Sequence, residues 1–275
     1  MKLQYLGTAA AEAIPGLFCG CETCRRARKL GGRNLRTRSQ ALVDGVLMID
    51  FPPDTVDHML RFGLDLSEIR WLLVTHIHED HWNPLDLRFT KPGFSAPPEN
   101  WPGLHIFGSE DLRPDVEKLQ KDGVSGIFYT AVEPFKPFAL GKYTVTALKA
   151  WHGSAHPYNY IISDGEKTLL YDHDSDVFND ETYAYLKSAG VKFDFVSMDC
   201  TSGAEEDMPY RGHMCLGRNR ICRQMLLDIG AADENTVFAV NHFSHNGKDA
   251  CYDDLLPQAE AMGFAVSYDG MEIVI

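Results

Sequence analysis

The densest group of potential metal ligands in the chain is the segment His76-Ile77-His78-Glu79-Asp80-His81. Imidazole nitrogens and carboxylate oxygens bind divalent cations well. The segment directly follows Trp71-Leu72-Leu73-Val74, an apolar run typical of a strand that is buried on both faces. In a turn that follows a strand, side chains that are close in the sequence can point at two adjacent metal positions. We therefore predict a metal site here rather than an exposed polar loop.

Ligands from a single turn cannot fill the coordination shells of two cations, so other strand ends must contribute. Three suitable residues each follow a predicted strand, namely His152, Asp174 and His242. Taken singly, a His or Asp in such a position is more often a cap or turn residue. Their shared placement at strand ends favours a common metal-binding role.

The segment 76–81 matches the His-x-His-x-Asp-His motif of the metallo-β-lactamase superfamily, and the chain resembles that superfamily over its whole length. The resemblance implies an α/β fold, an αβ/βα four-layer sandwich with two mixed β-sheets, in a single domain over residues 1–275. It also implies the ligands, which are His76, His78 and His152 for one cation, Asp80, His81 and His242 for the other, and Asp174 as a bridge. Asp172 is an alternative bridge, although the Asp-Ser pair at 174–175 favours Asp174.

A second group of ligands lies in Cys19-Gly20-Cys21-Glu22-Thr23-Cys24. Three thiolates and one more ligand would complete a tetrahedral zinc site, and His245 is the candidate for that ligand. Because His245 follows His242 by three residues, one loop would serve both metal sites. The alternative is that these cysteines are free buried or redox-active thiols.

The combination of the histidine motif and the cysteine cluster resembles the phosphoribosyl cyclic phosphodiesterase (PhnP) family of carbon-phosphorus lyase pathways. A related cofactor-biosynthesis branch of the superfamily has a similar cysteine cluster, so the cysteines alone do not fix the reaction. The resemblance to the PhnP family depends on three further segments, which are the Arg-rich stretch 24–28 that begins at the last of the three cysteines, Met-Asp-Cys at 198–200, and Asp-Gly-Met-Glu-Ile at 269–273. It implies that His213 contacts the substrate phosphate, whereas the alternative is a surface histidine near the start of a helix. The segment 152–157 departs from the family pattern, so the substrate is left open and His156 is a candidate additional pocket group.

From these residues we expect a phosphodiesterase that acts on small, cyclic phosphodiesters of the phosphoribosyl 1,2-cyclic phosphate kind. Two divalent metals, manganese or zinc, would generate hydroxide to attack phosphorus, with Asp80 and His213 as catalytic residues and zinc at the cysteines. A thioester or lactone hydrolase would use the same hydroxide on carbon. A non-catalytic module that binds metal or nucleotide is the alternative outside enzymology.

Charge and composition limit the partners. The net charge is −13, with 39 acidic and 26 basic residues, which argues against a surface for long nucleic acid and against a transfer-RNA nuclease. The basic run 25–38 could flank a small anionic substrate or be a solvated face. The first residues lack the long apolar run of a signal peptide or membrane helix, so we expect a cytoplasmic protein without membrane contact. A homodimer is expected from the resemblance alone.

Strands interleaved with helices must position these residues. The predicted strands cover 1–6, 41–43, 46–49, 71–74, 104–107, 143–148, 158–162, 168–171, 193–198, 237–240 and 264–268. The predicted helices cover 54–62, 111–120, 180–188, 216–229 and 249–262. Asp-Gly pairs at 44–45 and 164–165 predict hairpins. The segment 84–102, rich in Pro and Gly, is the best candidate for a loop over a site. This alternation indicates a layered α/β protein.

Overall fold

A computed structural model describes residues 1–208 and 212–275, and within these residues two β-sheets of seven strands each face one another. The strand orders are β14-β1-β2-β3-β4-β5-β6 and β13-β12-β11-β10-β9-β8-β7. Each sheet is mixed, because antiparallel pairs at one side give way to parallel pairs at the other. The first sheet belongs mainly to the first half of the chain and the second sheet to the rest.

The strands of the first sheet are β1 (Lys2–Gly7), β2 (Gln40–Val43), β3 (Leu47–Ile49), β4 (Trp71–Leu73), β5 (Leu104–Gly108), β6 (Ile127–Ala131) and β14 (Glu272–Val274). Those of the second sheet are β7 (Phe138–Leu140), β8 (Tyr143–Lys149), β9 (Tyr158–Ser163), β10 (Thr168–Asp172), β11 (Phe195–Asp199), β12 (Val237–Asn241) and β13 (Ala265–Val266). The predicted hairpins are confirmed, because β2 pairs with β3 and β9 with β10 in antiparallel register.

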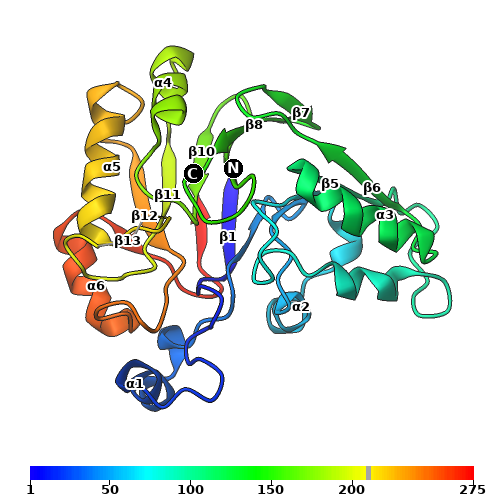
Figure 1. The fold of residues 1–275 in the computed structure, drawn as a ribbon, viewed down its shortest axis with the longest axis horizontal. Coiled ribbons are helices and arrows are strands. Elements are labelled where there is room, and N and C mark those ends of the chain that lie inside the picture. The colour runs from blue at the N-terminus through cyan, green and yellow to red at the C-terminus, as the bar shows by residue number, and fades with distance from the viewer. Residues whose placement is uncertain (209–211) are drawn as a thin grey trace.

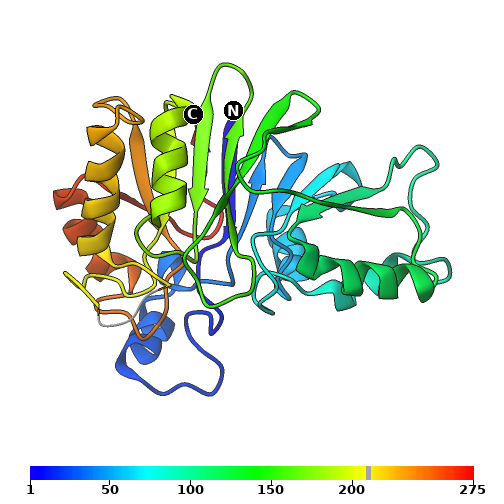
Figure 2. The ribbon, with the colours of Figure 1, turned by 45° about the horizontal axis from the view of Figure 1, so that its top comes forward.

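Helices cover the outer face of each sheet. The α-helices are α1 (Glu22–Leu30), α2 (Thr55–Phe62), α3 (Arg113–Lys121), α4 (Asp180–Ala189), α5 (Leu216–Asp228) and α6 (Tyr252–Ala261). In Figures 1 and 2, α4, α5 and α6 flank the second sheet, α2 and α3 lie on the side of the first sheet, and α1 projects from one end of the sandwich. The layers are thus helix, sheet, sheet and helix, as expected.

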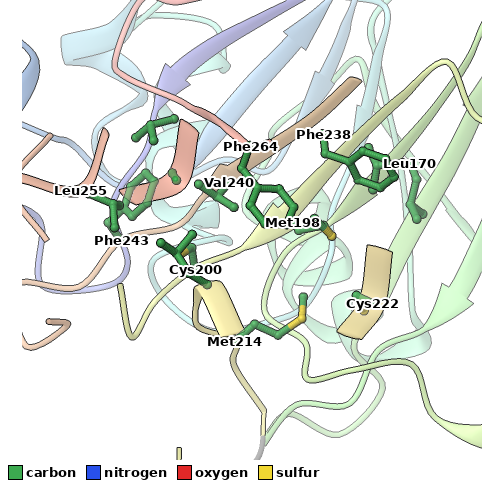
Figure 3. Packing of buried hydrophobic residues seen from close by; sticks show 14 of the residues in the cluster. Leu170, Met198, Cys200, Met214, Cys222, Phe238, Val240, Phe243, Leu255 and Phe264 are labelled. Carbon is green, nitrogen blue, oxygen red and sulfur yellow. The ribbon is translucent and has the colours of Figure 1, made fainter. Parts of the chain in front are cut away.

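Three apolar clusters hold these layers together. One fills the space between the sheets and includes Leu3, Val145 and Phe195. A second joins the first sheet to α3. The third packs the second sheet against its helices, and Figure 3 shows part of it. Burial of these side chains is the main favourable contribution to folding and fixes the strand ends relative to one another.

The predicted elements recur with shifted ends. The helix predicted over 216–229 is α5, and the one predicted over 249–262 begins only at Tyr252. The sequence did not predict β6, β7 or β14, and β13 is shorter than predicted. The segment 84–102 contains the 3-10 helix Pro84–Thr90, which contacts α3. Within the described residues, the helices are all too short or too polar to cross a membrane.

Candidate binuclear metal centre

The predicted ligands meet at one edge of the sandwich, where several strands end. His76 follows β4, His152 follows β8, Asp174 follows β10 and His242 follows β12. Parallel pairing of β10, β11 and β12 aligns their carboxyl ends, as the register of Asp172 with Met198 and of Asp199 with Asn241 shows. Side chains that are far apart in the sequence therefore come together because of the sheet topology.

The first group of ligand atoms consists of His76, His78 and His152. Nδ1 of His78 lies 2.9 Å from Nε2 of His76 and 3.1 Å from Nε2 of His152. Burial lowers the pKa of His76 well below its usual value, so its imidazole is neutral, as a metal ligand must be. Three ring nitrogens that converge in this way form one face of a coordination shell.

The second group consists of Asp80, His81 and His242. Nε2 of His81 lies 3.2 Å from Oδ2 of Asp80 and 3.3 Å from Nε2 of His242. Burial opposes the charged form of His242, but Asp174 and Asp199 outweigh it and raise the pKa of His242 to about 10. The two carboxylates thus make a positive charge favourable at this position, whether it is carried by a proton or by a metal cation.

Asp174 connects the two groups. Its Oδ2 lies 3.0 Å from Nε2 of His81 and 3.0 Å from Nε2 of His242, whereas its Oδ1 lies 3.6 Å from Nε2 of His152. Each carboxylate oxygen therefore faces a different group of ligands. This geometry is that of a carboxylate able to bridge two cations.

The alternative bridge, Asp172, belongs to none of the groups of converging ligand atoms among the described residues. It is the last residue of β10 and is fully buried, and its Oδ2 has no hydrogen-bond partner within residues 1–208 and 212–275. Burial, reinforced by the charge of Asp199, raises the pKa of Asp172 well above its usual value. Burial thus favours the uncharged form of Asp172, and of the two acids only Asp174 belongs to the groups of ligand atoms found among the described residues.

Two carboxylates that orient the histidines were not singled out from the sequence as site residues. Asp50, which follows β3, lies with Oδ2 2.7 Å from Nδ1 of His81 and also accepts hydrogen bonds from Thr75. Holding Nδ1 in this way directs Nε2 of His81 at the centre. The only sequence signal for Asp50 was an acid directly after a predicted strand.

Asp199 plays the same part on the other side. Its Oδ2 lies 3.3 Å from Nδ1 of His242 and 3.0 Å from Nδ1 of His213, and Thr201 Oγ1 lies within 3.1 Å of both rings. The backbone N–H groups of Thr201 and Met214 donate to Oδ1 of Asp199. Asp199 is thus held firmly and orients two histidines at once.

His213, which the resemblance assigns to the substrate, lies beside the centre. Its ring is 4.8 Å from that of His152 and 5.7 Å from that of His242, measured between centroids. Burial lowers the pKa of His213, but Asp199 and Asp174 outweigh it and raise the pKa above the usual 6.5. Since Nδ1 is held by Asp199, Nε2 is the nitrogen available to a substrate.

Three residues of the centre have left-handed backbone conformations, which non-glycine residues rarely adopt. The φ angles are +66° at Asp50, +50° at Asp174 and +63° at His242. Such a conformation costs on the order of 1 kcal/mol and persists only where the surroundings enforce it. Its occurrence at three strand ends around one centre is typical of a functional site.

The arrangement fits two divalent cations. In the first group, unprotonated ring nitrogens that face one another at 2.9 and 3.1 Å would repel, and a cation bound by them would remove that repulsion. Oδ2 of Asp174 is buried, and two imidazole nitrogens lie 3.0 Å from it. Neither nitrogen is oriented to form a hydrogen bond with it, so this oxygen has no hydrogen-bond partner among the described residues. Imidazole and carboxylate donors suit zinc, manganese or iron. A cation in each group would satisfy these donors.

The predicted cysteine site also assembles. The ligand atoms of Cys19, Cys21, Cys24 and His245 lie within 4.8 Å of one another, with Nδ1 of His245 3.5 Å from Sγ of Cys21. Burial opposes ionisation of Cys21, but hydrogen bonds from Cys24 and its neighbours lower the pKa of Cys21 to about 6. Three sulfurs and one nitrogen match a closed, structural zinc site.

Most basic residues of the run 25–38 are exposed, and Arg36 alone among them is buried. Arg28 donates to the carbonyl of Cys19, Arg26 forms a two-pronged ion pair with Asp254, and Arg36 is fully buried against Phe243. These contacts stabilise the loop that carries the cysteines. His156, the candidate pocket residue, is exposed and pairs with Asp111 instead of joining either group of ligands.

Two facing mixed sheets between helix layers, with ligands at the strand ends, define the metallo-β-lactamase fold. Similar solved structures are zinc-bound PqqB from Methylobacterium extorquens (TM-score 0.76, 16% identity, all of both chains), a diphosphatase of the PhnP family (0.73, 20%, 100% of this chain and 97% of that one), and the metallo-β-lactamase fold protein YhfI from Bacillus subtilis (0.68, 19%, 99% of each). No protein-family model and no curated protein matches the chain.

Proposed function

We propose that this protein is a binuclear metal-dependent hydrolase of small phosphodiesters, of the phosphoribosyl cyclic phosphate kind. The observation that carries the proposal is the position of Asp174, whose two oxygens face two separate groups of ligands. Bound there, two cations would supply Lewis-acid activation of water and neutralise charge on the phosphate. The similarity to a diphosphatase of the PhnP family supports reaction at phosphorus rather than at carbon.

The chain itself would hold and orient the reacting groups. His76, His78 and His152 would hold one cation, and His81, His242 and Asp80 the other. Asp50 and Asp199 keep His81 and His242 in the required orientation through their Nδ1 atoms. A centre fixed in advance needs little reorganisation during the reaction.

His213 favours a phosphodiester over a carbon ester. A phosphodiester is anionic before the reaction and gains charge in the transition state, so a cationic donor beside the cations is useful. Asp199 holds Nδ1 of His213 at 3.0 Å and favours the imidazolium form. We assign to His213 a contact with the phosphate and donation of a proton to the leaving oxygen.

The test is a parallel assay on protein purified without chelator, with metal content measured on the same sample. The substrates are bis(p-nitrophenyl) phosphate, a ribose cyclic phosphate, an acyl-homoserine lactone and a glutathione thioester. We expect turnover of the phosphodiesters that is lost with a chelator and restored by manganese or zinc. Turnover of the carbon esters alone would overturn the proposal.

A further inference from the structure

Buried polar side chains cross the space between the two sheets just behind the metal centre. Tyr5 from the first sheet and Ser197 from the second are joined by a hydrogen bond of 2.5 Å between their hydroxyls. His173 and Asn241 continue the chain of contacts within the second sheet. All four side chains are at most 1% exposed, so each must find its partners inside the protein.

The donors and acceptors in this network are defined by Asn241. Its Oδ1 accepts from the hydroxyl of Ser267 at 2.5 Å, so its Nδ2 carries the hydrogens and donates to Ser39 at 3.3 Å and to Nδ1 of His173 at 3.2 Å. His173 therefore bears its hydrogen on Nε2, which donates to Ser197 at 2.7 Å. Every polar side-chain atom of His173 and Asn241 is thus engaged.

The positions of these two residues give the contact its significance. His173 directly precedes Asp174, and Asn241 directly precedes His242. Strands β10 and β12 are separated by β11, so their backbones do not pair with each other. The side-chain contact between His173 and Asn241 is thus a direct tie between the two strand ends.

The backbone turns sharply just after this tie. Asp174 and His242 have φ angles of +50° and +63°, and their side chains meet with Oδ2 3.0 Å from Nε2. A further bond, from the side-chain amide of Asn159 to the carbonyl of His173, holds the start of the first turn at 2.7 Å. A change in the distance between His173 and Asn241 would therefore change the distance between Oδ2 of Asp174 and Nε2 of His242.

We propose that the His173–Asn241 contact is a positioning device that sets the separation of Asp174 and His242 and thereby the affinity of the centre for a divalent cation. His173 and Asn241 are positioning residues, because neither reaches the centre with its own side chain. The inference rests on the metal centre of the proposed function, but it does not depend on which reaction the centre performs. The competing explanation is that the network only adds stability.

Two substitutions at one position separate these explanations. His173→Asn keeps an acceptor near the position of Nδ1 and so keeps the contact with Asn241, but it loses the donor to Ser197. His173→Gln keeps a donor toward Ser197 and loses the acceptor for Asn241. Tyr143→Phe is the matched control, because it removes another buried hydroxyl bond, to Asp44, at the opposite end of the strands.

The measurements are the dissociation constant for Co2+ in chelator-stripped full-length protein, the Co2+ absorption spectrum, and the free energy of unfolding. Sulfur-to-cobalt bands separate the cysteine site from the histidine and carboxylate centre. We expect His173→Gln to weaken binding at that centre by about 10- to 100-fold. His173→Asn and Tyr143→Phe should bind close to the native value even where unfolding becomes easier.

Equal affinity of His173→Gln and the native protein would overturn the proposal, as would equal weakening in all three variants in step with lost stability. If His173→Gln does not fold, Asn241→Asp, which keeps the acceptor for Ser267 and loses both donors, replaces it with the same expectation. A protein that hydrolyses no phosphodiester still yields these affinities. Failure of the proposed reaction and failure of the positioning role are therefore separate results.

Discussion

Oδ2 of Asp174 lies 3.0 Å from Nε2 of His242, although the two residues are brought in by different strands, β10 and β12. The same oxygen lies 3.0 Å from Nε2 of His81, and the other oxygen faces His152. A single carboxylate thus connects ligands from three other parts of the chain.

Asp174 and Asp172 should respond oppositely to the same conservative change. Asp174→Asn removes one anionic oxygen from the bridge, so we expect loss of metal and a fall in turnover of at least about 100-fold. Asp172→Asn resembles the protonated acid that burial already favours, so metal content should stay and stability should change by less than about 1 kcal/mol. Metal analysis, steady-state kinetics and urea unfolding measure these effects. Metal loss in Asp172→Asn alone would show that the assignment is reversed.

His213 should affect turnover without affecting metal content. Its Nδ1 is held by Asp199, and it belongs to neither of the two groups assigned to the cations, although its ligand atom also lies within 4.8 Å of those of Asp174, Asp199 and His242. We expect His213→Ala to lower kcat by about 100- to 10,000-fold, the range for loss of a general acid. His213→Gln keeps a neutral hydrogen-bond donor for the phosphate. Its KM should therefore be closer to the native value than that of His213→Ala, whereas its kcat should stay low because the proton transfer is lost. Parallel loss of metal and turnover would refute this role.

The cysteine site should hold one zinc per chain independently of the catalytic centre. Cys24→Ser replaces a buried thiol ligand, so the zinc should be lost and the unfolding midpoint lowered. Cys222→Ala is the control, because Cys222 is buried in the core far in sequence from the site. It should lose some stability and keep its zinc. Full zinc content in Cys24→Ser would mean that these thiols are free.

His58 should make stability depend on pH. Burial lowers the pKa of His58 from 6.5 to about 4, so the unfolded chain binds a proton more readily than the folded one. Stability from this residue is complete above pH 6.5 and is lost as pH falls toward 4, by at most about 3 kcal/mol. Urea unfolding of the native protein and of His58→Gln from pH 7 to 4 measures the difference. Parallel pH profiles for the two proteins would contradict the prediction.

The strands that the sequence did not predict are edge strands. β6, β7 and β14 each lie at the end of a sheet, and β13, which is shorter than predicted, lies at the fourth edge. An edge strand is covered less completely, so its residues need no continuous apolar run or regular alternation. In β14 none of the residues Glu272–Val274 is buried. Central strands such as β4 and β12 were predicted because they are buried on both faces and therefore contain continuous apolar runs.

The site was predictable to the extent that its residues form a local motif or follow central strands. His76 to His81 are clustered in the sequence, and Asp174 and His242 follow apolar runs. Asp50 and Asp199 also follow predicted strands, yet a lone acid in that position is more often a turn residue. Their role depends on Nδ1 atoms of histidines from other strands, a tertiary relationship without a local signal.

The most direct test is a crystal grown with ample Mn2+ and measured for anomalous scattering. We expect two peaks about 3.5–4 Å apart, with the Asp174 carboxylate between them and His152 and His242 on opposite sides. A single peak, or two peaks with Asp174 bound to neither, would contradict this expectation.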